Sequence, residues 1–353
     1  KYQITPWLNI TGRANIDRIF DRFETKYSQG TILWASQAGG YYEQSNLVST
    51  QKWFDAILSG ENDITKDLKI TYNAGAIFQD NRSDQGWMTA NGLNIPNKFS
   101  VGFATNPSMS SSNYQVQTQS VFGQFNLSFK EYLFLDASLR NDWSSPLPDP
   151  HSFSYPSVGL SAIISDMVQL PSLFSFLKAS VNYAQVGNGG QAQILNVTYG
   201  YSQGAGGGFL QRSSTFPIPN LKPEIVKNLE FNVESKFLAN RLSLNLTYYK
   251  SNSFNQLLRI SLPTATGYGD RYINAGNVQN SGFEVTLNGT PVQNKDFSWE
   301  VGLNFATNKN KIIKLSDELK RTQLGGGYGR SATPVIVEGG SYGDLVAQGW
   351  LRS

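Results

Sequence analysis

The sequence predicts an all-β protein, an antiparallel transmembrane β-barrel, from three observations. Apolar and polar residues alternate with period two along many segments, which is the pattern of strands that have one apolar and one polar face. Short and long connections between these segments alternate along the chain. Even the longest uninterrupted apolar runs, such as Tyr132 to Leu135, are far shorter than the roughly 18 residues that a membrane-spanning helix requires.

About eleven strands follow from the alternation. A lone strand is predicted near Thr5 to Ile19. Five hairpins come after it, and they join residues 48–58 to 68–76, 121–129 to 133–139, 156–165 to 177–183, 228–236 to 242–248, and 283–287 to 299–305. We expect strands of about ten residues, a length that matches a tilted crossing of the hydrocarbon layer.

The most regular hairpin has both faces of such a strand. Leu229, Phe231 and Val233 alternate with Glu230 and Glu234, and the pattern resumes after a short break. The apolar residues of the second strand are Leu242, Leu244 and Leu246. In a barrel wall the apolar set would face lipid, and the polar set would line a wet interior. The residues that we expect to face this interior are Glu230, Glu234, Arg241 and Asn245.

The connections fall into two length classes. Five are short, and the five long ones span residues 20–47, 80–118, 143–155, 187–226 and 252–280. Because every second connection of an antiparallel barrel lies on the same side of the membrane, this alternation predicts short periplasmic turns and long extracellular loops. A soluble β-sandwich also alternates along its strands, but its loops need not sort by length.

Composition narrows the classes of function. Only 16% of the 353 residues are charged, against roughly 25% in an ordinary soluble domain. The net charge of +3 is spread along the chain, so no basic region predicts a nucleic-acid partner. The chain has no cysteine, which excludes disulfides and thiolate metal sites, and its only histidine is His151. We expect neither a cofactor nor a metal.

Two short motifs resemble catalytic or cofactor-binding patterns, and we reject both. Residues 200–204 match the Gly-x-Ser-x-Gly elbow of serine hydrolases, but the glycine-rich residues that follow cannot begin a stable helix. Residues 187–192 match the Gly-x-Gly-x-x-Ala dinucleotide fingerprint, but no helical period follows them. We expect no catalytic residue, and therefore a protein that is not an enzyme.

Aromatic residues in the long connections are the candidate ligand contacts. Their rings could stack on sugars or close over a ligand, or they could pack the loops against each other. The candidates for contact with a ligand, or with a lid above it, in extracellular loops are Tyr199, Tyr201, Tyr268, Tyr272, Trp87, Tyr41 and Tyr42.

Longer stretches of the chain resemble a known family. Residues 220–224, Asn-Leu-Lys-Pro-Glu, resemble an element common in TonB-dependent outer-membrane receptors. Five further stretches are similar to the C-terminal half of the barrel in the SusC/RagA family of TonB-linked transporters, namely residues 153–166, 246–258, 272–292, 296–315 and 338–345. The resemblance covers nearly the whole chain.

The resemblance implies a 22-stranded barrel that crosses the outer membrane of a Gram-negative bacterium many times. In this family a plug fills the barrel, a SusD-like surface lipoprotein closes over it as a lid, and TonB energises the import of an oligosaccharide or oligopeptide. The predicted strands would form about half of such a barrel. We therefore expect residues 1–353 to be a partial barrel domain, without the plug or the N-terminal extension.

Two other functions fit the same alternation. A passive outer-membrane porin would share the pattern of strands and loops, and a soluble β-sandwich that binds glycans would share the alternating strands. Neither would share the family stretches.

Overall fold

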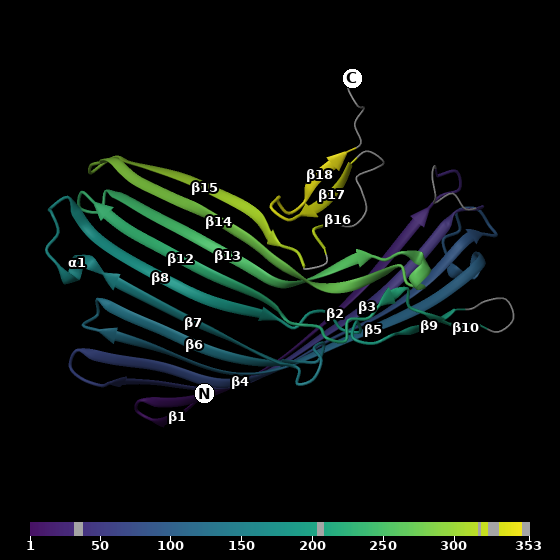
Figure 1. Cartoon of the computed structure of the whole chain (residues 1–353), viewed down its shortest axis with the longest axis horizontal. Helices are drawn as coiled ribbons and strands as arrows, with labels where there is room; N and C mark the ends of the chain where they lie inside the picture. The colour runs from purple at the N-terminus through teal and green to yellow at the C-terminus, as the bar shows by residue number, and fades with distance from the viewer. Residues whose placement is uncertain (32–37, 203–207, 317–318, 324–331, 348–353) are drawn as a thin grey trace, which may run out of the picture. The chain divides into compact units, whose positions relative to one another are not determined.

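A computed structural model describes residues 1–31, 38–202, 208–316, 319–323 and 332–347 (Figure 1). The main sheet has 13 strands. They are β1 (Tyr2–Thr5), β2 (Leu8–Tyr27), β3 (Tyr41–Asp63), β4 (Leu68–Leu93), β5 (Ala104–Phe129), β6 (Leu133–Ser144), β7 (Ser152–Ile163), β8 (Phe174–Asn188), β11 (Thr215–Phe216), β12 (Glu224–Phe237), β13 (Leu242–Ser261), β14 (Asp270–Gln293) and β15 (Ser298–Lys314).

Smaller elements lie between and after these strands. β9 (Tyr199–Ser202) pairs with β10 (Phe209–Arg212), and β16 (Arg321–Gln323), β17 (Ala332–Val337) and β18 (Asp344–Ala347) form a three-stranded sheet. The helices are the 3-10 turns η1 (Val101–Phe103) and η2 (Thr264–Thr266) and the short α1 (Ile164–Met167). Among the described residues, no helix has both the length and the apolar character that a membrane crossing needs.

The chain divides into two compact units, and each is described by itself. Unit 1 contains residues 1–10, 57–75 and 121–353, and unit 2 contains residues 11–56 and 76–120. In unit 1 the strand order follows the sequence from β6 through β7, β8, β12, β13 and β14 to β15, with antiparallel neighbours throughout. β11 is the exception, because it lies parallel to β14. Among the described residues, no pairing joins β15 to β1, so the sheet is not closed.

All five predicted hairpins are present, and the predicted antiparallel all-β class is confirmed. The eleven predicted strands correspond to β2–β8 and β12–β15. The predicted lone N-terminal strand differs from the structure, because the chain forms two strands there, β1 and β2. Pro6 lies between them, and proline lacks the N–H that an uninterrupted strand would donate.

The strands are longer than predicted, and the connections are shorter. β13 has 20 residues and β14 has 24, so that only residues 262–269 connect them, whereas the sequence predicts a loop over 252–280. Likewise, only residues 94–103 separate β4 from β5. Outside the part of a strand that crosses the membrane, both of its faces can contact water. The alternation of apolar and polar residues that marks a strand in the sequence is therefore lost there.

The predicted apolar and polar sets lie on opposite faces of the sheet. Phe231 lies directly between Val181 of β8 and Tyr248 of β13, and Tyr248 in turn lies opposite Phe283 of β14. The next residue of β12, Asn232, points the other way, and its side-chain amide donates to Asn245 at 2.7 Å and to Thr247 at 2.9 Å. The expected period-two faces are therefore continuous across neighbouring strands.

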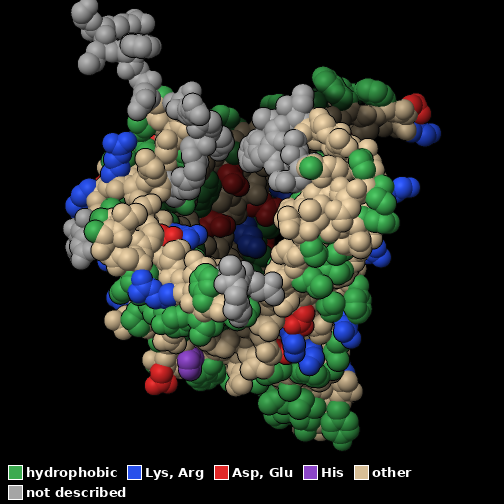
Figure 2. Space-filling view, turned by 90° about the vertical axis from the view of Figure 1, so that its right-hand side faces the viewer, with side chains coloured by type: hydrophobic (Ala, Val, Ile, Leu, Met, Phe, Trp, Pro, Cys, Tyr) green, Lys and Arg blue, Asp and Glu red, His purple; other side chains and the backbone are tan. Residues whose placement is uncertain are grey.

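The apolar face is exposed to a degree that a soluble protein rarely shows. Phe231 is 46% exposed, Leu303 is 61% exposed and Phe305 is 62% exposed. Figure 2 shows broad patches of hydrophobic side chains on the surface that it presents. Contiguous exposed apolar surface of this kind marks contact with lipid or with another protein.

Buried apolar clusters lie away from the short turns, near the opposite ends of the strands. One cluster joins Val278, Ile312 and Leu315 to Ile336 of β17. Residues 338–342 fasten this region to β15, because Ile312 donates its N–H to Gly340 at 2.9 Å and accepts one from Gly339 at 2.8 Å. The three-stranded sheet is thereby anchored to the end of β15.

Candidate ligand-binding site

A cavity of about 650 Å³ lies in unit 1, where the ends of β13 and β14 meet β16. The residues that line it are mostly polar or charged, and they include Arg259, Ser261, Asp270, Arg321, Thr322 and Gln323. Its volume lies within the range of small-molecule sites. The cavity is at the ends of strands that extend well beyond the predicted membrane-spanning part.

An ion pair sets the charge on one wall of the cavity. Arg259 Nη2 lies 2.6 Å from Asp270 Oδ2, and the same nitrogen donates to Thr215 Oγ1 at 3.3 Å. The hydrogen bond from Arg259 lowers the pKa of the Asp270 carboxyl, and the same bond raises the pKa of the guanidinium. Both groups are therefore charged at neutral pH, and Asp270 holds Arg259 in place.

The loop between β13 and β14 is supported by the segment that contains β10 and β11. Gly269 donates its N–H to Ser214 at 2.8 Å, and Arg212 Nη2 donates to the Gly267 carbonyl at 2.6 Å. The Arg212 guanidinium lies 4.0 Å from the centre of the Tyr268 ring, and Phe216 meets that ring edge-on at 5.0 Å. Tyr268 thus joins two segments far apart in the sequence.

Of the predicted contact residues in unit 1, only Tyr268 lies in a loop. Tyr199 and Tyr201 lie on β9 and are 62% and 66% exposed. Tyr272 lies on β14, where its hydroxyl donates to Gln191 Oε1 at 3.4 Å and its ring packs against a buried cluster that contains Leu221. The structure places Tyr268 and Tyr272 near the cavity-lining end of β14 and leaves Tyr199 and Tyr201 on a separate hairpin.

In unit 2 the predicted residues lie in strands, which corrects their assignment to a loop. Tyr41 and Tyr42 begin β3, and Trp87 lies on β4. Adjacent residues of a strand point to opposite faces. The Tyr41 ring is tilted against the Tyr27 ring, with ring centres 5.6 Å apart, whereas Tyr42 is only 5% exposed and packs with Ala90. The two tyrosines therefore cannot serve one ligand from the same face.

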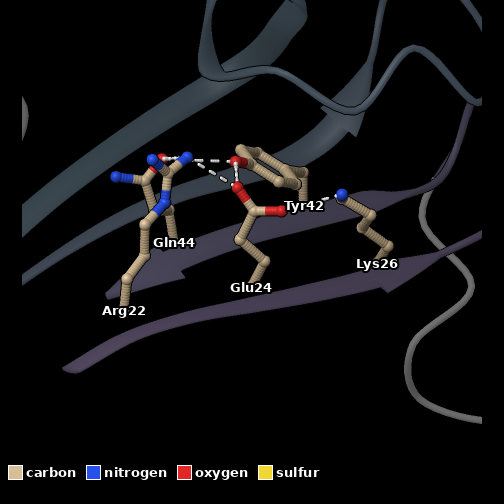
Figure 3. Close-up of polar contacts among 5 residues, drawn as sticks. All are labelled: Arg22, Glu24, Lys26, Tyr42 and Gln44. Atoms are coloured by element: carbon tan, nitrogen blue, oxygen red, sulfur yellow. Dashed lines mark hydrogen bonds and ion pairs between the residues drawn. The ribbon is translucent and has the colours of Figure 1, made fainter. Parts of the chain in front are cut away.

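A cluster that the sequence analysis missed surrounds Glu24 (Figure 3). The Glu24 carboxylate accepts hydrogen bonds from Lys26 at 2.8 Å, Arg22 at 2.7 Å and Tyr42 at 3.1 Å, and Arg22 also donates to Gln44 at 3.2 Å. The bond from Lys26, followed by those from Arg22 and Tyr42, lowers the pKa of Glu24 to about 2. The Arg-x-Glu-x-Lys spacing could have predicted this cluster from the sequence. Residues two apart on a strand share one face, so the three charges lie side by side.

Of the predicted interior-facing residues, Glu230 and Glu234 lie on β12 and Asn245 lies on β13, all on the polar face. Arg241 lies in the turn between β12 and β13 and is therefore not part of a strand face. It donates to the Gln293 carbonyl at 3.4 Å. Arg241 continues the alternation of polar and apolar residues along the strand that follows it. The sequence pattern therefore predicts that this strand begins one residue earlier than β13 does.

The two rejected motifs lack the surroundings that their chemistry requires. β8 ends at Asn188, and the next described element is the strand β9 and not a helix. Gly200 and Tyr201 belong to the β9–β10 hairpin, while Gln203 and Gly204 lie outside the described residues. In the part of the chain that the structure describes, no group of three or more His, Asp or Glu side chains could hold a metal ion.

Comparison with known proteins identifies the fold. The model of a family of TonB-dependent receptor barrels matches residues 2–341. TonB-dependent receptor P26 of Formosa agariphila is 28% identical over 311 residues, which are 84% of this chain and 31% of that protein. TonB-dependent receptor SusC of Bacteroides thetaiotaomicron is 29% identical over 98 residues, which are 28% of this chain and 10% of that protein.

Among solved structures, the RagAB peptide transporter is similar with a TM-score of 0.80 and 21% identity, over 95% of this chain and 37% of that one. The chain thus spans about a third of the length of these relatives. The resemblance to the SusC/RagA family that the sequence indicated is confirmed. The names of these relatives describe two of them as TonB-dependent receptors and one as a peptide transporter. With its family model matched along nearly its whole length, the chain belongs to the family described as TonB dependent receptor-like, beta-barrel.

Proposed function

We propose that the complete protein imports a nutrient across the outer membrane and that residues 1–353 are a partial barrel domain of it. The observation that carries this proposal is the exposed apolar face of β6–β15, which lies back to back with a polar face along the same strands. A wall of this kind separates lipid from a wet interior. Membership in the barrel family supports the same conclusion.

The proposed partners are TonB and a SusD-like surface lipoprotein. Similarity to SusC and to the RagAB peptide transporter supports this proposal. The substrate would be an oligosaccharide or an oligopeptide, captured at the strand ends that carry the 650 Å³ cavity. Loops and strand ends held on a rigid wall are a common place for recognition.

The experiment is an uptake assay with the complete protein in its own cells, with and without a functional TonB. We expect uptake of the growth nutrient to stop when TonB is removed, while the amount of protein in the outer membrane stays the same. Uptake that persists without TonB would support a passive porin. Recovery of the protein in the aqueous fraction, without heat-modifiable migration, would support a soluble glycan-binding protein.

A further inference from the structure

We propose that the cavity between β13, β14 and β16 binds a carboxylate group of the imported ligand, with Arg321 as its ion-pair partner and Arg259 as a second donor. This inference rests on the proposed import function and adds to it the chemistry of the ligand. It follows from the charge, the geometry and the anchoring of the residues that line the cavity.

The described residues of the lining carry one more positive charge than negative. Arg259 and Arg321 supply two positive charges, and Asp270 supplies one negative charge. Asp270 is already paired with Arg259. Arg321 makes no side-chain hydrogen bond or ion pair with the residues that the structure describes. A ligand with a single negative charge would balance the charges of these described residues, whereas a phosphate dianion would leave an excess of negative charge.

The guanidinium of Arg259 is held by two hydrogen bonds, but both come from the same nitrogen atom. Its Nη2 atom serves both Asp270 and Thr215, and its side chain is 56% exposed. The Nη1 and Nε donors have no hydrogen-bond partner among the described residues. A guanidinium fixed through one edge presents its remaining N–H groups in a set direction, and this geometry favours a planar carboxylate.

Arg321 is placed by a rigid support. It pairs with Val337 across β16 and β17, and the next pair joins Thr322 to Ile336. Val335 and Ile336 are 1% and 0% exposed, so the strand beside β16 is among the most deeply buried parts of the chain. The anchored backbone fixes where the Arg321 side chain begins, so only the side chain itself has to be ordered when a ligand binds.

Polar groups beside the two arginines could bind the rest of the ligand. Ser261, Thr322 and Gln323 offer hydroxyl and amide groups along the cavity. The volume exceeds that of one carboxylate, which leaves room for neighbouring residues of an oligomer. The carboxylate could come from the C-terminus of a peptide or from an acidic sugar, and the test separates these two sources.

The test uses matched pairs of probes on the complete protein, purified in detergent together with its lipoprotein partner. The first pair is an oligogalacturonate mixture and its carboxyl-reduced form, and the second is a mixed tripeptide library and its C-terminally amidated form. We expect one acidic probe to bind at least about tenfold more tightly than its neutral form, the effect of one charged hydrogen-bonded pair. Which pair discriminates names the source of the carboxylate.

Variants assign the effect to the cavity. Arg321→Gln should remove the preference for the acidic probe and leave binding of the neutral probe unchanged. Lys320→Gln is the matched control, because Lys320 is the neighbouring cation, pairs with Glu338 at 3.0 Å and does not line the cavity. Unchanged heat-modifiable migration of both variants verifies that the barrel has folded.

The inference is overturned if neither acidic probe binds better than its neutral form, or if Arg321→Gln and Lys320→Gln behave alike. This failure is distinct from failure of the proposed function. TonB-dependent uptake without a preference for acidic probes would leave the import function standing and remove only the carboxylate site. Loss of any TonB dependence would instead remove the import function.

Discussion

Val233 of β12 lies directly opposite Leu246 of β13, and the next pair along the strands, Glu234 and Asn245, lies on the other face of the sheet. The first pair belongs to the exposed apolar face, since Val233 is 37% exposed and Leu246 is 40% exposed. If this face meets lipid, Leu246→Arg should destabilise the complete protein by about 2–4 kcal/mol, the cost of a cation near the bilayer midplane. Unfolding by urea in lipid vesicles measures this change.

The control for this prediction is Asn245→Arg, one residue away on the polar face. It should cost much less, because its charge would remain in water. Equal costs for the two variants would contradict the assignment of the faces.

The sidedness of the connections gives a second prediction, and the lack of cysteine makes it simple to test. Gln211→Cys, on β10, should react with a membrane-impermeant maleimide on intact cells that make the complete protein. Ser172→Cys, in the exposed turn between β7 and β8, should react only after the cells are opened. The reverse pattern of labelling would invert the topology.

Tyr268 gives a third prediction. Tyr268→Ala removes the contacts with Arg212 and Phe216 and should destabilise the loop at residues 262–269 by about 1–2 kcal/mol. Amide hydrogen exchange in this loop should become correspondingly faster. Tyr268→Phe keeps both ring contacts and should exchange like the original protein. Equal exchange in the alanine and phenylalanine variants would mean that these contacts do not hold the loop.

The cluster around Glu24 predicts an unusual dependence on pH. The pKa of Glu24 lies at about 2, below its ordinary value of 4.5, in the part of β2 beyond the predicted membrane crossing. A carboxylate with a lowered pKa stabilises the fold fully above its ordinary pKa, and this contribution disappears as the pH falls through the lowered value. The difference in urea midpoint between the original protein and Glu24→Gln should persist at pH 4 and shrink toward pH 2. A difference already absent at pH 4 would contradict the lowered pKa.

The sequence predicted the part of each strand that carries an apolar face. Alternation is enforced where one side of a strand must be apolar, and for this reason it predicts the pairing of β12 with β13 and the separation of their apolar and polar residues to opposite faces. The first half of β5 has no such requirement. Its run Ser108-Met109-Ser110-Ser111-Ser112 carries no period, and it was predicted to be part of a loop although it is a strand.

The candidate site was less accessible to sequence reasoning. The pairing of Arg259 with Asp270 depends on the register of β13 against β14, and the contribution of Arg321 depends on how a distant small sheet packs. Aromatic residues were a partial guide only. Tyr268 is an example, because its ring is engaged by Arg212 and Phe216, a contact that composition does not predict.

One face of these strands is expected to meet lipid and the other to meet water in the native outer membrane. A spin label placed in turn at each position from Leu229 to Glu234 of the complete protein measures this. We expect labels at 229, 231 and 233 to be relaxed by oxygen, which is concentrated in lipid, and labels at 230, 232 and 234 to be relaxed by a water-soluble nickel complex. Relaxation by the nickel complex at all positions, or the opposite alternation, would show that the two faces are not divided between lipid and water in this way.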